Sequence, residues 1–274
     1  TARSIAPRLS ERLGQQVIID NRGGILSMEL VAKAPADGYT LLVASASLWT
    51  SQFLRDDVPW DPLQDYAPIS LLVTSPNILI VHPSLPVRSV KELIALARAR
   101  PGALNYASGQ SGASSHTAAE LFEAMSGVEL LRVAYKGQGP AMLSLITGET
   151  QVSFPTAAAA TPFIKSGRAR PLAVTTAKPS ALAPGLTTLA AAGLPGYESK
   201  AILGMFAPAK APAAVISRLN VEIVRTLNEP DVKQRLLASG AEPVASTPQE
   251  LLAEMQSDMA TTGKLLKKIG ATAK

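Results

Sequence analysis

The sequence lacks cysteine, and it contains only two histidines among its 274 residues. Without cysteine the chain can form no disulfide, no thiolate metal site and no cysteine nucleophile. The histidines, His82 and His116, lie far apart in the sequence, and Asp56, Asp57 and Asp61 lack the spacing of a calcium-binding loop. We therefore expect neither a metal site nor a cofactor.

Long hydrophobic runs and dense charge are also scarce. No apolar run approaches the roughly 20 residues that a membrane-spanning helix needs, although the hydrophobic fraction of 47% is ample for folded cores. The net charge is +5, but Lys and Arg are scattered except for the cluster 264–268. We interpret that cluster as the solvated face of an amphipathic helix, and we expect no nucleic-acid partner. The chain opens at Thr1 without a recognisable signal peptide, which indicates a processed or trimmed N-terminus.

The length and the hydrophobic periodicity favour two α/β domains. A chain of 274 residues exceeds the usual size of one domain. Apolar spacing predicts helices over 1–13, 28–34, 90–99, 114–125, 140–146, 157–165, 213–227, 232–238 and 247–268. Strands are predicted over 17–20, 39–44, 69–73, 77–81, 104–107, 130–134, 150–154, 169–175 and 202–207. Strict alternation between residues 104 and 175 predicts parallel strands joined by right-handed crossovers, and the 39–44 run is typical of a parallel sheet.

Two successive strand–loop–helix units carry small polar residues in their loops. The first loop and helix start contain Ser108, Gly109, Gly112, Ala113, Ser114, Ser115 and His116. The second runs from Val133 to Pro140, and Pro140 suits the first position of a helix. Backbone amides and hydroxyls at the positive end of a helix suit a carboxylate or another anion. The sequence therefore predicts a binding site for a small acid.

A catalytic site is the alternative interpretation of the first loop. Nucleophilic catalysis needs a serine with a base within hydrogen-bond reach. Ser114 and His116 are two residues apart, which places them on different faces of a helix. The segment 109–113 resembles a nucleophile elbow but lacks its final glycine, and 137–139 lacks the third glycine of a dinucleotide-binding fingerprint. A serine-dependent hydrolase using Ser111 or Ser114 with His116 remains the competing hypothesis.

Trp49 follows the predicted strand end at 45–47. Ligands of parallel α/β folds bind beyond the carboxyl ends of strands, so Trp49 is a candidate ligand contact. Burial in a core is the commoner fate of an aromatic side chain. Both interpretations stay open on the sequence alone.

Segments along the whole chain resemble one known family. They are 9–15 (LSERLGQ), 20–22 (DNR), 32–42 (AKAPADGYTLL), 65–70 (DYAPIS), 89–94 (SVKELI), 101–106 (PGALNY), 135–137 (YKG), 193–198 (GLPGYE) and 240–243 (GAEP). In this order they resemble the periplasmic solute-binding receptors of tripartite tricarboxylate transporters, also called Bug receptors.

The resemblance implies a fold like that of type II periplasmic binding proteins, with two α/β domains around a ligand cleft. Its hinge crossovers would lie near 82–86 and 197–201, which gives one domain of 1–83 plus 200–274 and a second of 84–199. It also implies a monomeric periplasmic receptor, not an enzyme, that captures a small carboxylate and passes it to a membrane permease. A receptor that presents its closed form to a signalling partner is the alternative within this class.

The resemblance also implies the ligand loops: Ser45, Ala46, Ser47 and Leu48, then Ser108, Gly109, Gly112, Ala113, Ser114, Ser115 and His116, and finally Phe154 and Thr156, with Tyr135 positioning the second loop. Trp49 joins these candidate contacts on its place after a strand end rather than on the resemblance. Three features depart from the family pattern. The strand and Pro/Gly-rich loop that usually precede the first helix are not in this sequence, and the turn after Arg22 is short. Pro155 stands where an acidic residue usually follows the Phe154 equivalent, so plain carboxylates are favoured over amino acids.

Overall fold

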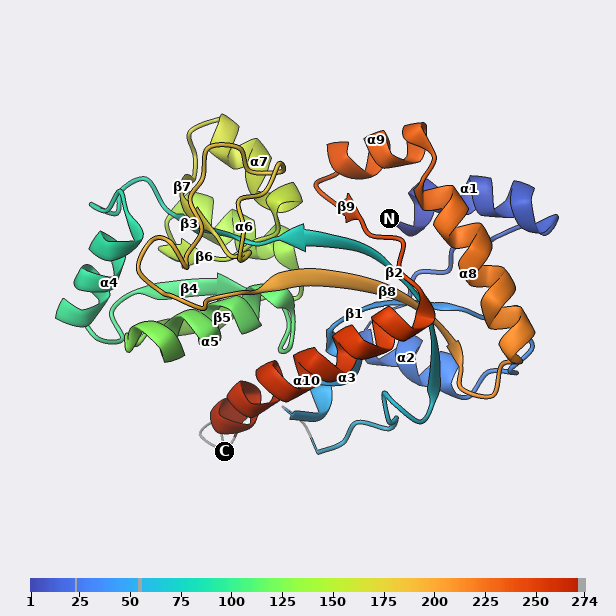
Figure 1. The fold of residues 1–274 in the computed structure, drawn as a ribbon. Helices are drawn as coiled ribbons and strands as arrows, with labels where there is room; N and C mark the ends of the chain where they lie inside the picture. The colour runs from blue at the N-terminus through green and yellow to red at the C-terminus, as the bar shows by residue number, and fades with distance from the viewer. Residues whose placement is uncertain (23, 54–55, 271–274) are drawn as a thin grey trace. The chain divides into compact units, whose positions relative to one another are not determined.

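The computed structural model describes residues 1–22, 24–53 and 56–270, with side chains through residue 263. The chain forms two compact units, unit 1 of Thr1–Thr74 and Ile202–Lys274, and unit 2 of Ser75–Ala201. Each unit contains one sheet with helices on both faces (Figure 1). The sequence placed the first crossover near residue 84, whereas unit 2 begins at Ser75, because strand β3 (Ile78–Val81) pairs within the sheet of unit 2.

The sheet of unit 2 is mixed rather than parallel throughout. Its strand order is β5 (Leu131–Ala134), β4 (Asn105–Ser108), β6 (Val152–Ser153), β3 and β7 (Arg170–Val174). Strand β4 pairs in parallel with β5 and β6, as the alternation predicts. Strand β3, which lies outside that alternation, is antiparallel to both β6 and β7, so β7 runs in the same direction as β4, β5 and β6. Strand β3 follows β2 (Tyr66–Pro76), which belongs to the sheet of unit 1, so the chain enters the sheet of unit 2 at β3.

Strand β3 shows how the two faces of this sheet are filled. Its side chains alternate between faces, as in any strand. Leu79 and Val81 pack in the cluster formed with α4 (Val90–Ala99) and α5 (Ser114–Ser126). Ile78 and Ile80 pack in the other cluster, with α6 (Gln138–Thr147) and α7 (Ala157–Lys165). The continuous apolar run of β3 is therefore explained by burial on both faces.

Unit 1 has a four-stranded sheet in the order β1 (Leu42–Ser45), β8 (Lys200–Pro208), β2 and β9 (Glu242–Pro243). On one face pack α1 (Ala2–Leu13), α8 (Ala213–Leu227) and α9 (Pro230–Ala238). On the other pack α2 (Gly24–Ala32), α3 (Ser47–Thr50) and α10 (Pro248–Gly270), while the short helix η1 (Ser51–Phe53) follows α3. Strand β1 is antiparallel to β8, so its expected parallel pairing is wrong.

The predicted strand over 17–20 does not form. Ile18 is 77% exposed, and the Val17 amide donates to Ser10 Oγ at 2.9 Å instead of to a neighbouring strand. Strand β1 likewise begins at Leu42 rather than at Tyr39, whose side chain is 80% exposed. An apolar, β-branched sequence thus favours a strand only where a sheet edge is available to pair with it.

Two predicted helix caps are present, whereas other helix starts differ from the prediction: α2 begins at Gly24 rather than at 28, and α9 at Pro230 rather than at 232. Ser89 Oγ accepts from the Glu92 amide at 3.2 Å, which confirms the cap of α4. At the start of α10, the Glu250 amide donates to Thr247 Oγ1 and Glu250 Oε2 accepts from the Thr247 amide, which completes the capping box. Helix α6 begins at Gln138, so Pro140 is not at its first position as predicted.

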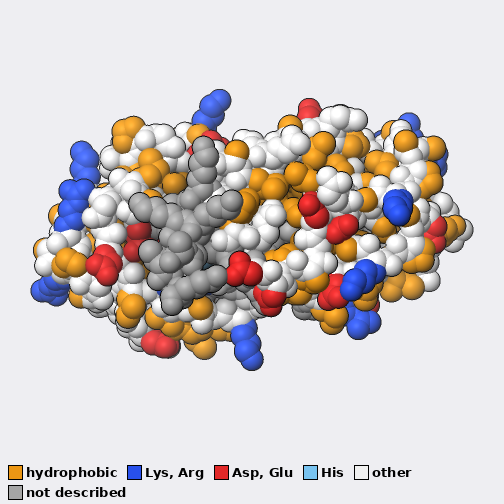
Figure 2. Space-filling view, turned by 90° about the horizontal axis from the view of Figure 1, so that it is seen from below, with side chains coloured by type: hydrophobic (Ala, Val, Ile, Leu, Met, Phe, Trp, Pro, Cys, Tyr) orange, Lys and Arg blue, Asp and Glu red, His pale blue; other side chains and the backbone are white. Residues whose placement is uncertain are grey.

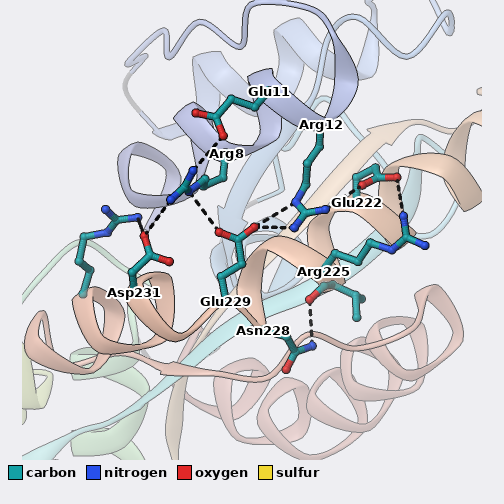
Figure 3. A network of polar contacts seen from close by, with 10 residues as sticks. Arg8, Glu11, Arg12, Glu222, Arg225, Asn228, Glu229 and Asp231 are labelled. Carbon is teal, nitrogen blue, oxygen red and sulfur yellow. Dashed lines mark hydrogen bonds and ion pairs between the residues drawn. The ribbon is translucent and has the colours of Figure 1, made fainter.

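A network of ion pairs joins α1 to α8 and α9 in unit 1 (Figure 3). Glu229, the residue before α9, lies 2.6 Å from Arg12 Nη2 and 3.1 Å from Arg8 Nε. A carboxylate at that position also suits the positive end of α9. The Glu222 side chain is only 4% exposed and lies within 3.3–3.7 Å of Arg12, Arg218 and Arg225. The network therefore surrounds one buried carboxylate with arginines.

The described surface shows no single basic patch on the face drawn in Figure 2, where Lys and Arg side chains are spread apart. The side chains of the cluster 264–268 lie outside the described residues, so its expected exposure is not addressed. Among the described residues no helix has the length and hydrophobicity to cross a membrane.

Candidate functional site

The loop between β4 and α5 in unit 2 has the predicted strand–loop–helix form. Strand β4 ends at Ser108 and α5 begins at Ser114. The Gly109 amide donates to Ser115 Oγ at 3.0 Å, and the Gly112 amide donates to His116 Nδ1 at 3.1 Å. Gly112 has φ of 79°, a left-handed conformation that favours glycine. Side chains of the first turn of α5 therefore hold the 109–113 loop against the start of their own helix.

Two backbone donors remain free at the start of α5. In the described structure the amides of Ser114 and Ser115 have no protein acceptor, as expected for the first positions of a helix. Ser114 Oγ accepts a hydrogen bond from Asn77 Nδ2 at 3.3 Å, which leaves the Ser114 hydroxyl proton available as a further donor. Three donors thus lie together at the positive end of α5.

Asn77 links this helix start to the segment between β6 and α7. Its Nδ2 donates to the Phe154 carbonyl at 2.6 Å as well as to Ser114, and its backbone is bonded to Thr175 Oγ1. Its Oδ1 is buried without a protein partner in the described residues. Thr156, which forms a bridge with Asn77, caps α7 and donates to Gln138 Oε1 at 2.9 Å. Asn77 therefore brings Ser114, Phe154 and Thr156 together.

Arg132 on β5 supports the same loop from the other side. Its guanidinium donates to Ser108 Oγ at 2.8 Å, to Ser111 Oγ at 3.2 Å and to the Gly109 carbonyl at 3.1 Å. All three nitrogens are thus committed to loop oxygens. Arg132 therefore ties the loop to strand β5 through three of its five N–H groups.

His116 is buried beside two further ionisable groups. Its Nε2 lies 3.4 Å from Glu120 Oε1, and the same carboxylate accepts from the Tyr106 hydroxyl on β4. Burial favours protonation of Glu120, yet its pKa is lowered because hydrogen bonds from His116 and Tyr106 outweigh burial. Burial, and then the Glu120 charge, raise the pKa of Tyr106. Glu120 is therefore the ionised member of this group.

Two predicted ligand residues have their side chains directed elsewhere. The Tyr135 amide donates to the Ser108 carbonyl at 2.9 Å, but its hydroxyl donates to Glu149 at 3.0 Å. The Phe154 ring is fully buried against Phe122, with ring centroids 5.6 Å apart. Only the Phe154 carbonyl reaches the site, through Asn77.

The ligand contacts predicted in unit 1 also fall into two groups, one at the end of a strand and one buried in the core. Ser45 and Ser47 have their hydroxyls 2.9 Å apart at the end of β1 and the start of α3, and Ala46 precedes that helix. Leu48 and Trp49 are buried in the core, and Trp49 Nε1 donates to Asp258 at 2.7 Å. The Trp49 ring therefore lies in the core, which was one of the two interpretations of the sequence.

Sequence reasoning missed Asn77 and Arg132. Each is a polar residue in or beside an apolar strand, where an uncharged, aliphatic side chain is the rule. A polar residue at such a position could have indicated a role for Asn77 and Arg132, because a buried polar group needs a hydrogen-bond partner. Among the described residues there is also no group of three or more His, Cys, Asp or Glu that could hold a metal ion.

Comparison with known proteins shows to which fold and family this chain belongs. The fold is that of periplasmic solute-binding proteins. The family model described as "Tripartite tricarboxylate transporter family receptor" matches residues 1–271. The chain therefore belongs to the tripartite tricarboxylate transporter receptor family, which confirms the resemblance seen in the sequence.

Several relatives illustrate the similarity. BugT of Bordetella pertussis is 32% identical, over 100% of this chain and 85% of its own length. The structure of Rpa4515 of R. palustris with adipate is 37% identical, with a TM-score of 0.90, over 98% of this chain and 91% of that chain. The structure of MatC from Rhodopseudomonas palustris with bound malate is 26% identical, with a TM-score of 0.86, over 97% of this chain and 92% of that chain. The solved structure of the periplasmic binding protein BugD is also similar, with 30% identity and a TM-score of 0.88, over 98% of this chain and 92% of that chain.

Proposed function

We propose that this chain is a monomeric periplasmic receptor that captures a small carboxylate and delivers it to the membrane permease of a tripartite tricarboxylate-type transporter. The observation that carries the proposal is the set of free donors at the start of α5, the amides of Ser114 and Ser115 and the Ser114 hydroxyl. Two relatives have structures with dicarboxylates, adipate and malate. A carboxylate accepts hydrogen bonds through both of its oxygens, which matches such a cluster of donors.

The chemistry of the loop favours plain carboxylates. The donors offered by α5, two backbone amides and a hydroxyl, are uncharged. Pro155 lies in the segment that Asn77 joins to Ser114, and it has no carboxylate with which to pair an ammonium group. We therefore propose a dicarboxylate or another plain acid as the ligand, in preference to an amino acid.

The position of His116 argues against the serine-hydrolase alternative. A general base must have a ring nitrogen within reach of the nucleophile. Both nitrogens of His116 already face other groups, Nδ1 the Gly112 amide and Nε2 the Glu120 carboxylate. Labelling of Ser111 or Ser114 by a serine-reactive fluorophosphonate would revive the hydrolase hypothesis, and we expect no labelling.

A thermal-shift screen against mono-, di- and tricarboxylates, amino acids and aromatic acids tests the proposal. A ligand at about 100 times its dissociation constant adds about 2.7 kcal/mol to the free energy of unfolding, which raises the melting temperature clearly. We expect a response confined to plain carboxylates. A protein that responds to no acid, or only to amino acids, would contradict the proposed ligand class.

Titration calorimetry of variants then locates the site. We expect Ser114→Ala to weaken binding of the identified acid about fivefold, because one neutral hydrogen bond is worth about 1 kcal/mol. Ser166→Ala, which removes an exposed hydroxyl elsewhere in unit 2, is the matched control. The paired variant Ser45→Ala with Ser47→Ala tests the predicted contribution of unit 1. Unchanged affinity in Ser114→Ala would remove this hydroxyl from the site.

A further inference from the structure

His116 is a buried imidazole whose two nitrogens have different partners. The residue is 2% exposed and lies in the first turn of α5. Nδ1 accepts the hydrogen bond of the Gly112 amide at 3.1 Å, while Nε2 lies 3.4 Å from Glu120 Oε1. Gly112 itself has the left-handed φ of 79°. The imidazole thus accepts the hydrogen bond of the one residue, Gly112, that gives the 109–113 loop its left-handed turn.

The two contacts select the same neutral tautomer. Glu120 also accepts a hydrogen bond from the Tyr106 hydroxyl, and hydrogen bonding to the carboxylate keeps it ionised. An ionised carboxylate carries no proton, so the proton between Glu120 and His116 belongs to Nε2. A neutral imidazole with its proton on Nε2 has a lone pair on Nδ1, which is what the Gly112 amide requires.

We propose that His116 is a positioning residue that holds the 109–113 loop only in its neutral form, so that protonation of His116 weakens carboxylate binding. In the imidazolium both nitrogens carry protons, and Nδ1–H would then face the Gly112 N–H. Two donors cannot share a hydrogen bond, so the Gly112 peptide must turn or move away. This inference rests on the proposed function, because the amides of Ser114 and Ser115 directly follow the loop that would shift.

The charged neighbours of His116 determine what protonation does. Glu120 and Glu123 come from α5, Tyr106 from β4 and Arg132 from β5. Glu120 is a counter-ion for an imidazolium, so the protonated ring is tolerated inside the fold. Arg132 interacts with Glu120 and opposes a second positive charge nearby. Burial raises the pKa of Glu123 to about 7, so Glu123 loses charge as the pH falls and does not replace Glu120.

The first experiment compares His116→Gln and His116→Leu with the wild type by calorimetric titration with adipate between about pH 8 and about pH 5.5, where imidazoles titrate. Glutamine offers an oxygen to Gly112 and an amide to Glu120, so the affinity of this variant should change with pH only through groups that the wild type shares, such as Glu123 and adipate itself. We expect the wild type to lose about tenfold more affinity than His116→Gln over this range, and His116→Leu to bind weakly throughout. His82→Gln, which removes the other histidine, should behave as the wild type does.

The second experiment needs no ligand. Nitrogen-15 spectra of the free protein report the tautomer of His116 and the amide of Gly112 during the same titration. We expect an Nε2–H tautomer at pH 8, and a Gly112 amide resonance that moves in step with His116 protonation. An Nδ1–H tautomer, a Gly112 resonance indifferent to His116, or equal pH dependence in the wild type and His116→Gln would overturn the inference. If adipate and other acids do not bind at any pH, the proposed function fails while the spectra still decide the role of His116.

Discussion

Arg132→Met is the sharpest test of how the 109–113 loop is held. The substitution removes three hydrogen bonds from a half-buried guanidinium, of 2.8 Å to Ser108 Oγ, 3.1 Å to the Gly109 carbonyl and 3.2 Å to Ser111 Oγ. Ser108 is fully buried, so that bond is worth about 2 kcal/mol as a hydrogen bond to a charged group. The Gly109 bond adds about 1 kcal/mol, whereas the Ser111 bond is exposed and adds little.

Burial offsets part of this gain. The guanidinium is half-buried, so its charge is partly removed from water and about 1 kcal/mol is recovered when methionine replaces it. The expected loss in the free energy of unfolding is therefore about 2 kcal/mol, or about 6 °C in melting temperature for a unit of this size.

Scanning calorimetry measures this loss, and titration calorimetry should show weaker carboxylate binding in the same variant. Arg132→Lys should be nearly as destabilised, because an ammonium group cannot make the three-way contact. Arg88→Met, at an exposed arginine of unit 2, is the control for loss of charge. A melting temperature of Arg132→Met within about 1 °C of that control would refute the idea that Arg132 holds the loop.

Two further predictions concern buried carboxyl groups. Burial raises the pKa of Glu123 to about 7, above that of the unfolded chain, so the folded protein binds the extra proton and its stability falls as the pH rises from about 4.5 through 7. Glu123→Gln retains an acceptor for the Leu130 amide, and should melt above the wild type at pH 8 but not at pH 4.5; equal melting temperatures at pH 8 would contradict this assignment. Glu222→Ala leaves three arginines without their shared carboxylate and should cost about 2 kcal/mol in thermal unfolding. Glu11→Ala, at an exposed ion pair, should cost less than about 1 kcal/mol, and a similar cost for both variants would refute the special role of Glu222.

The sequence predicted local structure well where local signals decide it. Helix α4, with its Ser89 cap, and the form of the 109–113 loop follow from capping residues and periodicity. Pairing direction was harder, because the apolar run of β1 looks the same in a parallel or an antiparallel sheet. The expected strand over 17–20 failed for a related reason, since strand propensity does not supply a partner strand.

The candidate site was predicted as a backbone feature, and its supporting side chains were not. Spacing alone can indicate that Ser114 and Ser115 begin a helix, since helix starts have local signals. It cannot indicate that Asn77 lies against Ser114, because these residues come from segments brought together only by the sheet of unit 2. The buried carbonyl of Phe154 contributes in the same non-local way.

Hydrogen bonds from the first turn of α5 and from Arg132 explain why only a few donors of the loop remain free. The Gly109 and Gly112 amides are satisfied by Ser115 and His116, and the loop oxygens are satisfied largely by Arg132. A loop whose polar groups were all unpaired would adopt many conformations, and a ligand would have to order it at a cost in affinity. With these groups already paired, the amides at the start of α5 are held in place before a ligand arrives. We therefore expect binding at the proposed site to depend as much on Arg132 and His116, which hold the loop, as on the proposed donor Ser114.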